Sequence, residues 1–262
     1  MNMFKWFSIF IIFFVAVLGG YYPLVKRDKS RGKKGLPTGE SFTAGVFLAL
    51  SLVIMLPAGL HLFGMSFPDI NYPLAAIFVI ASFLFLLALE QLSANLKQKE
   101  EGDLIFSGPI IPVIMTIMIA IPSFLLGSAI GISPALQAEF ILVAVLVHKG
   151  SAGFGLALTM ARSTLTRMQT YFLYLLFALS TPFGIFVGAD ISKFLRGDTI
   201  VIVKAVILSL AAGVFLYMST VHGLRRTALV EHCSGVKGFS LMFLGLVITA
   251  LVRLVLGLAH AG

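Results

Sequence analysis

Long, uninterrupted apolar runs follow one another along this chain, with short polar connections between them. Eight runs reach roughly the 20 residues that a helix needs to cross a bilayer: 4–25, 42–63, 72–92, 105–132, 140–160, 171–188, 200–221 and 239–258. Apolar and polar residues do not alternate within them, as they would in transmembrane strands. The pattern therefore predicts an all-α membrane protein with eight transmembrane helices in a single transmembrane domain, residues 1–262.

The first run also has the length of a secretory signal peptide, with Lys5 as a minimal basic region. However, bulky Tyr21 and Tyr22 follow Gly19 and Gly20, where cleavage would require a small-x-small sequence. We therefore predict that this run is kept as a membrane span.

Composition supports the membrane assignment. Hydrophobic residues make up 59% of the chain and charged residues 11%, whereas soluble domains carry about 25% charged residues. The single cysteine cannot build a disulfide framework or a cysteine-lined zinc site. The chain also lacks the basic and aromatic surface needed to bind nucleic acid.

Lysine and arginine in short loops indicate orientation, because they accumulate on the cytoplasmic side. With the N-terminus outside, the outer loops hold only Lys5, Lys193 and Arg196. The inner loops hold thirteen basic residues: Lys26, Arg27, Lys29, Arg31, Lys33, Lys34, Lys97, Lys99, Arg162, Arg167, Arg225, Arg226 and Lys237. We therefore expect both termini outside the cytoplasm, in a plasma membrane or bacterial inner membrane. The net charge of +8 mainly reflects this topology, with weak attraction to anionic membrane lipid as a by-product.

One pentapeptide occurs twice, as Ala44-Gly45-Val46-Phe47-Leu48 in the second run and Ala212-Gly213-Val214-Phe215-Leu216 in the seventh. The predicted topology gives these two runs opposite directions. Identical segments in opposed helices are typical of inverted repeats, a transporter architecture with its substrate site near the membrane midplane. The repeat would pair spans one to three with spans six to eight.

The two central runs contain the residues best placed for chemistry. His148 and Lys149 lie near the middle of the fifth run, where ionisable side chains are costly and usually functional. Pro122 lies near the middle of the fourth run and Ser123 follows it; a proline there frees a carbonyl and often marks a cavity or site. The alternative is structural: His148 would bond a neighbouring helix and Lys149 would extend toward the membrane surface.

Weaker candidates lie near the span ends. His61, Met65 and Asp69 at the outer end of the second run form a candidate entrance for cations. His222, His232 and Cys233 on the inner side form a candidate exit, although scattered loop histidines are often ordinary surface residues. Enzyme motifs are missing: the sequence has no His-Glu-x-x-His pair, Gly-x-Ser-x-Gly elbow or Walker-type phosphate loop. We expect no enzymatic activity and no resident cofactor.

Several local sequences carry a family resemblance. They are Phe42-Thr43-Ala44-Gly45-Val46-Phe47-Leu48 leading to Leu56-Pro57, Tyr72-Pro73-Leu74-Ala75-Ala76 leading to Leu89-Glu90, His148-Lys149-Gly150, Thr181-Pro182-Phe183-Gly184-Ile185, and Ala211-Ala212-Gly213-Val214-Phe215-Leu216-Tyr217. Their order over nearly the whole chain resembles the ZIP (Zrt/Irt-like) family of divalent metal transporters. The resemblance implies a three-plus-two-plus-three inverted repeat, zinc or a related metal as cargo, and a homodimer.

The metal-binding motif departs from the family pattern. The family's fourth span carries His-Ser/Asn-x-x-Glu-Gly, but here Pro122 replaces the histidine and Leu126 the glutamate. In the fifth span Ala152 stands where a glutamate is common. The resemblance leaves His148 as the one retained metal ligand, with Ser123 as a weak oxygen ligand. It also implies that Lys149 places its own cation in the family's second metal site.

Three functions remain open. Zinc sites usually use three or four protein ligands, and a nearby ammonium repels a dication. The leading hypothesis is nevertheless a divalent metal transporter that works by alternating access with an atypical site. The second is a protein of this fold that no longer transports and acts as a regulatory partner or scaffold. The third is a transporter of an anion or neutral solute, with Lys149 as the selecting residue.

Overall fold

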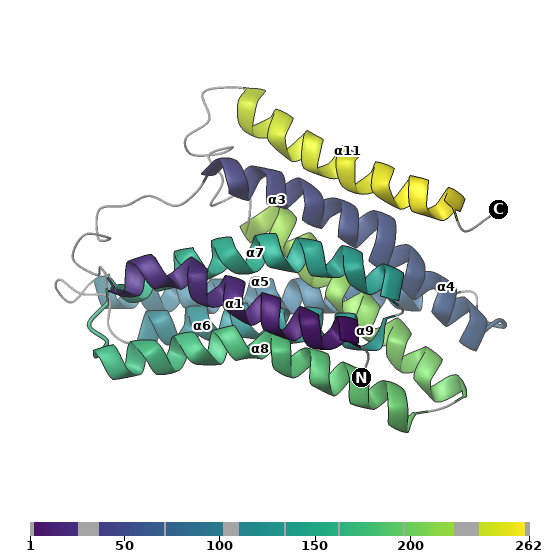
Figure 1. Ribbon diagram of the computed structural model, residues 1–262, viewed down its shortest axis with the longest axis horizontal. Coiled ribbons are helices and arrows are strands. Elements are labelled where there is room, and N and C mark those ends of the chain that lie inside the picture. Colours follow the sequence, from purple (N-terminus) through teal and green to yellow (C-terminus); the bar gives the residue numbers. More distant parts are fainter. Residues whose placement is uncertain are drawn as a thin grey trace. The chain divides into compact units, whose positions relative to one another are not determined.

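A computed structural model describes residues 3–25, 37–70, 72–101, 110–133, 135–161, 163–195, 197–222 and 236–259. Within these ranges the regular structure is helical and there is no strand, so the all-α prediction is confirmed for them. The elements are α1 (Met3–Val25), α3 (Pro37–Ala49), η1 (Leu50–Met55), α4 (Leu56–Ser66), α5 (Leu74–Glu101), α6 (Ile110–Ile132), α7 (Ala135–Ala161), α8 (Arg167–Phe194), α9 (Asp198–Tyr217), η2 (Met218–His222) and α11 (Val236–Ala259) (Figure 1).

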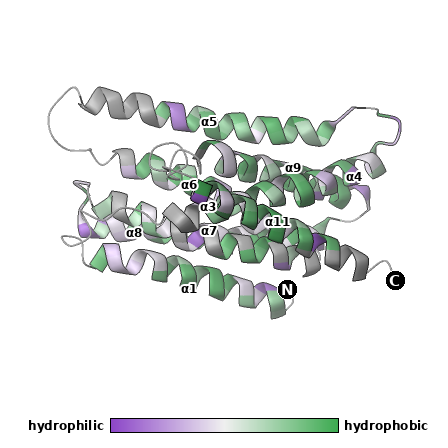
Figure 2. Ribbon diagram, turned by 90° about the horizontal axis from the view of Figure 1, so that it is seen from above, coloured by the Kyte–Doolittle hydropathy of each residue, from purple (hydrophilic) through white to green (hydrophobic). Residues whose placement is uncertain are grey.

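Among the described residues, six helical stretches are long and apolar enough to cross a membrane: Met3–Val25, Ala44–Ser66, Leu74–Leu92, Pro112–Ile132, Arg167–Phe194 and Asp198–Val221. They correspond to six of the eight predicted spans, the first run included. The predicted fifth and eighth spans fall within α7 and α11, which are helical but are not among these six. Hydrophobic residues dominate the coloured parts of the helices (Figure 2).

The helices group into two compact units, Met1–Gly35 with Leu86–Phe194, and Leu36–Phe85 with Leu195–Gly262. In the first unit α1 packs on α7, and α6 packs on α8. Two interhelical hydrogen bonds position α1. The Tyr174 hydroxyl of α8 donates to the carbonyl of Ala16 at 2.5 Å. The Lys5 ammonium donates to the carbonyl of Gly131, one of the last four in α6, which have no partner within their own helix.

The N-terminus of α8 is fixed by local sequence. Thr166 precedes the helix, and its backbone N–H donates to the Gln169 side-chain oxygen at 3.0 Å. In return the Gln169 N–H donates to the Thr166 hydroxyl at 3.3 Å. This reciprocal pair is a capping box, which satisfies backbone donors that the first helical turn leaves unpaired. The cap sets where α8 begins and therefore where its mid-helix polar residues fall.

Glycines bring α6 and α8 into backbone contact. A Cβ added at Gly127 would collide with the carbonyl oxygen of Thr181, and one at Gly184 with the carbonyl oxygen of Phe124. Small residues allow such close approach in membranes, where packing rather than the hydrophobic effect drives helix association. The two helices run in the same direction, because Gly127 meets Thr181 and Gly131 meets Ile185.

In the second unit the two copies of the pentapeptide lie on contacting helices. Phe47 and Phe215, at the same position in each copy, have ring centroids 4.9 Å apart. The Ser51 hydroxyl donates to the carbonyl of Ala212 at 2.8 Å, and Gly59 lies against Ser209. The residue numbers of these contacts rise along one helix and fall along the other, so the two helices are antiparallel. The opposite directions expected for the two copies are therefore observed.

Each copy is followed at the same distance by a short π-helical segment. The α-helix gives way to η1 at Leu50, two residues after Leu48, and to η2 at Met218, two residues after Leu216. Each segment has a buried serine in its second position, Ser51 and Ser219. Their bonds differ, because Ser51 donates across to the other helix whereas Ser219 donates to Leu216 in its own chain segment. The likeness of the two copies thus extends beyond the five identical residues.

Candidate functional site

Pro122 and Ser123 lie inside α6, and both are buried. Pro122 has no N–H, so the carbonyl of Met118, four residues earlier, lacks its usual helical partner. Ser123 is 1% exposed, and its hydroxyl has no hydrogen-bond partner in the described part of the chain. The neighbouring Ser128 instead donates to the carbonyl of Phe124 at 3.0 Å, the usual way for a serine to be satisfied within an apolar helix. Ser123 is therefore an available oxygen in a buried position.

Lys149 is fully buried on α7 and is held by α8. Its ammonium donates to the carbonyl of Phe177 at 2.6 Å, to the Ser180 hydroxyl at 3.2 Å and to the Thr181 hydroxyl at 3.1 Å. It also lies 3.8 Å from the centroid of the Phe177 ring, where the negative face of the ring attracts a cation. An ammonium has three N–H donors, so these three acceptors use its whole donor capacity.

The arrangement explains how a lysine can be buried here. Isolated burial of an ammonium is very costly unless it is hydrogen-bonded, and charged hydrogen bonds are about twice as strong as neutral ones. The structural alternative predicted that Lys149 extends toward the membrane surface, and this prediction is wrong, because its ammonium bonds to α8. Lys149 joins α7 to α8 inside the first unit.

The other residues of the family's metal motif are placed as follows. His148 lies in α7, but its side chain is outside the described residues. Leu126 on α6 and Ala152 on α7, which replace acidic residues of the motif, are buried, at 1% and 7% exposed. Both are apolar and supply no metal ligand. The assignment of His148 as a ligand stays a prediction.

Of the candidate entrance and exit residues, the structure describes the side chains at the entrance but not those at the exit. His61 on α4 and Asp69, in the segment after α4, are exposed. The side chain of His222, at the end of η2, and the whole of His232 lie outside the described residues. Among the residues that the structure does describe, no three His, Cys, Asp or Glu side chains cluster as a metal site would require.

Sequence reasoning missed Ser180 and Thr181 as partners of Lys149. The available signal was a pair of hydroxyl residues directly before a mid-helix proline, Pro182. Hydroxyl side chains are common near prolines in membrane helices, where freed backbone groups must be satisfied. That signal does not indicate which neighbouring helix supplies a cation, because the pairing of helices is a property of the fold.

Comparison with known proteins bears on the identity of this fold. A sequence model described as "ZIP Zinc transporter" matches residues 3–107 and 97–253. Zinc transporter ZIP2 of Mus musculus is 26% identical over 205 residues, covering 67% of this chain and 66% of the relative. Zinc transporter 11 of Arabidopsis thaliana is 26% identical over 236 residues, covering 81% and 72%.

Zinc transporter ZIP1 of Homo sapiens is 25% identical over 229 residues, covering 71% of this chain and 68% of the relative. The matched region spans about two thirds of the length of these relatives. The family match covers nearly the whole chain, and the chain also has long apolar helices that identify an integral membrane protein. This chain therefore belongs to the ZIP zinc transporter family.

Proposed function

We propose that this protein carries a divalent metal ion, with zinc as the first candidate, across a membrane by alternating access. The proposed site is atypical and lies at Ser123 on α6 and His148 on α7. The family match and relatives named zinc transporters support metal as the cargo. The six long apolar helices of the described residues support a membrane location.

One observation carries the proposed site: the Ser123 hydroxyl is buried and has no hydrogen-bond partner among the residues that the structure describes. Leaving a buried hydroxyl unsatisfied costs about 1–3 kcal/mol, and a bound cargo would offset this cost by using the oxygen. The Met118 carbonyl, unpaired within α6 because of Pro122, is a second oxygen on the same helix. With the imidazole of His148 they provide two oxygens and one nitrogen.

Such a donor set binds weakly, and a transport site benefits from weak binding. A cargo must enter favourably and still leave. With no carboxylate, the metal would keep part of its hydration shell while it passes. We therefore expect low affinity and little discrimination between zinc and other first-row divalent metals, because this ligand set does not enforce a tight tetrahedral geometry.

The bonding of Lys149 weighs against anion transport. A selector for anions needs free N–H donors facing the cargo, but all three donors of Lys149 are engaged by Phe177, Ser180 and Thr181. Those oxygens also hold the positive charge against α8. Repulsion of a passing dication by Lys149 is thereby reduced, since charge interactions weaken with distance and with intervening dipoles.

The proposed architecture has eight spans in a three-plus-two-plus-three inverted repeat, with both termini outside and a homodimer as the assembly. Support for the additional spans comes from α7 and α11, with 27 and 24 residues, at 1.5 Å rise per residue. Support for the repeat comes from the antiparallel pentapeptide helices and their matching π-helical segments.

Zinc uptake into liposomes, followed with an indicator dye inside, tests the transport site. We expect uptake by the wild-type protein, a loss of at least tenfold in Ser123→Ala and loss of uptake in His148→Ala. Ser128→Ala is the matched control, because Ser128 already bonds Phe124 within its own helix; its uptake should stay within twofold. Equal uptake by Ser123→Ala and wild type would contradict the proposed site. No uptake of zinc, iron, manganese, cobalt or cadmium would contradict metal transport.

A regulatory or scaffold role without transport is the second candidate. The observation that favours it is the replacement of metal ligands by Pro122, Leu126 and Ala152, all buried in packed helices. This role predicts a folded, membrane-inserted protein with no uptake and no consequence of His148→Ala. The same liposome experiment therefore separates the two functions.

A further inference from the structure

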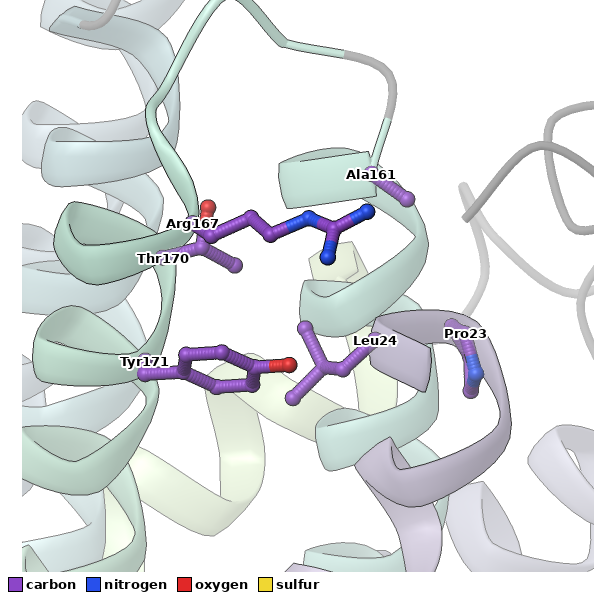
Figure 3. A pocket seen from close by; sticks show the side chains of 6 residues that line it. All are labelled: Pro23, Leu24, Ala161, Arg167, Thr170 and Tyr171. Atoms are coloured by element: carbon purple, nitrogen blue, oxygen red, sulfur yellow. The ribbon is translucent and has the colours of Figure 1, made fainter. Parts of the chain in front are cut away.

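A recess opens where the ends of three helices of the first unit meet. It is lined by Pro23, Leu24, Ala161, Arg167, Thr170 and Tyr171. These residues come from the last turn of α1, the last residue of α7 and the first turns of α8. In Figure 3 Arg167 extends from α8 toward the side of the recess that carries Ala161, and Tyr171 points its hydroxyl toward Leu24.

The charge of the recess has one sign. Arg167 and Tyr171 are exposed, no acidic residue lines the recess, and no carboxylate of the described residues pairs with Arg167. The recess also lies at the N-terminus of α8, whose dipole favours a negative group. The Thr170 hydroxyl is already used by the carbonyl of Thr166, so Arg167 and Tyr171 are the side-chain donors that remain for a ligand.

The sequence that follows α1 is strongly basic. Leu24 is followed by Val25, and the next nine residues contain six basic residues and one acidic residue: Lys26, Arg27, Asp28, Lys29, Ser30, Arg31, Gly32, Lys33 and Lys34. A run of this kind beside a transmembrane helix attracts anionic lipid.

The helical turns that line the recess also carry exposed apolar side chains. Tyr21 on α1 is 62% exposed, and Met168 and Phe172 on α8 are 80% and 61% exposed. A small soluble anion gains nothing from such neighbours, whereas the acyl chains of a lipid would cover them. Charge complementarity and these exposed apolar residues together favour a lipid over free phosphate.

We propose that the recess binds the phosphate-bearing headgroup of an anionic phospholipid. Arg167 donates charge-assisted hydrogen bonds to the phosphate, as guanidinium groups commonly do. The Tyr171 hydroxyl donates a further bond, and the acyl chains lie along the exposed apolar residues of α1 and α8. This site is separate from the transport site and does not depend on the cargo.

Native mass spectrometry of the full-length protein in detergent, with added short-chain phosphatidylglycerol, tests the proposal. Phosphatidylcholine of equal chain length is the neutral comparison, and inorganic phosphate tests for a free anion. We expect phosphatidylglycerol to bind at least fivefold more tightly than phosphatidylcholine and phosphate not to compete at millimolar concentration. Arg167→Gln should weaken phosphatidylglycerol binding at least tenfold, since one charged hydrogen bond contributes more than a tenfold change in affinity.

Two further variants test the contribution of the Tyr171 hydroxyl and control for the loss of one positive charge. Tyr171→Phe removes only a hydroxyl and should weaken binding several-fold without changing the fold. Lys193→Gln, at the other end of α8 and already paired with Asp190 at 2.9 Å, is the matched loss of one positive charge and should leave binding unchanged. Equal loss in Arg167→Gln and Lys193→Gln would overturn the site. Equal binding of the two lipids, or binding of phosphate without lipid, would overturn the lipid assignment.

Discussion

Phe47 and Phe215, at equivalent positions of the two pentapeptide copies, are in contact with each other, with ring centroids 4.9 Å apart and planes inclined by 42°. Both side chains are buried, at 3% and 0% exposed. Because each ring contacts its own counterpart, the two copies of the pentapeptide pack against each other at this position. The contact therefore gives the repeated sequence a physical role, because each copy supplies half of the same aromatic pair.

This pairing predicts energetic coupling between the two copies. Aromatic pairs contribute about 0.5–1.5 kcal/mol beyond the burial of their area. In a double-mutant cycle of Phe47→Leu and Phe215→Leu, thermal unfolding in detergent should show a coupling energy of about 1 kcal/mol. Phe63→Leu paired with Phe215→Leu is the control, since Phe63 stacks on Phe78 instead. Strict additivity in the Phe47–Phe215 cycle would contradict the prediction.

The acceptors of Lys149 should matter more for stability than Lys149 itself. Replacing Ser180 by alanine and Thr181 by valine leaves the buried ammonium with one carbonyl acceptor. Leaving a buried charge without its partners in this way should lower the free energy of unfolding by about 3–5 kcal/mol. Lys149→Met removes the charge and leaves hydroxyls that can bond their own helix, as Ser180 already does with Phe177 at 2.7 Å. Lys149→Met should therefore lower the free energy of unfolding by less than about 1.5 kcal/mol.

The fluorescence of the only tryptophan provides the measurement for this comparison. Trp6 packs edge-on against Phe186, with ring centroids 5.3 Å apart, so its emission reports the packing of α1 on α8. Unfolding in mixed micelles of increasing sodium dodecyl sulfate should be earliest for the Ser180 and Thr181 double variant. Earlier unfolding of Lys149→Met would show that the lysine is held by packing rather than by its acceptors.

Substitution at Gly127 should disrupt the contact of α6 with α8. An added methyl group meets the carbonyl oxygen of Thr181, and the backbone cannot move aside as a flexible side chain can. Gly127→Ala should therefore lower the free energy of unfolding by about 1–3 kcal/mol. Gly64→Ala is the matched control, because nothing lies within 4 Å of its added Cβ. The control should be neutral or stabilising by up to about 1 kcal/mol, since alanine favours helix. Thermal unfolding in detergent gives both values.

Removing the hydroxyl of Tyr174 should loosen α1 from α8. Tyr174→Phe keeps the ring, which packs edge-on against Phe177 at 5.6 Å, but loses the bond to the carbonyl of Ala16. The free energy of unfolding should fall by about 0.5–1.5 kcal/mol. The emission of Trp6 should then change at a lower denaturant concentration than in the wild-type protein. Tyr171→Phe, whose hydroxyl makes no such interhelical bond among the described residues, serves as the control. Identical unfolding of the two variants would contradict the role of the bond.

Much of the fold follows from the sequence because the signals are local. Run length and continuous apolarity predicted helices, and the regular elements of the described residues are helical. The opposite directions of the pentapeptide helices followed from their positions as the second and seventh predicted spans, and the contacts of Phe47 with Phe215 and of Ser51 with Ala212 agree with them. Such features depend on neighbours in the chain or on the membrane, which acts on every span alike.

The site was less predictable because it depends on which helices meet. Lys149 stood out as an ionisable residue in an apolar run, but its orientation toward Ser180 and Thr181 depends on the packing of α7 against α8. Ser123 was predicted as the residue after Pro122 and, from the family resemblance, as a weak oxygen ligand. That its hydroxyl has no partner in the described structure depends on all surrounding side chains, which no local pattern determines.

The backbone contact of α6 with α8 has a mechanical consequence. With main chain pressed directly on main chain at Gly127 and Gly184, there is no layer of side chains between the helices that could change rotamer and let one slide. Ser123 on one helix and the acceptors of Lys149 on the other are thus held at a fixed spacing. Any conformational change that moves α6 must therefore move α8 with it, as a single body.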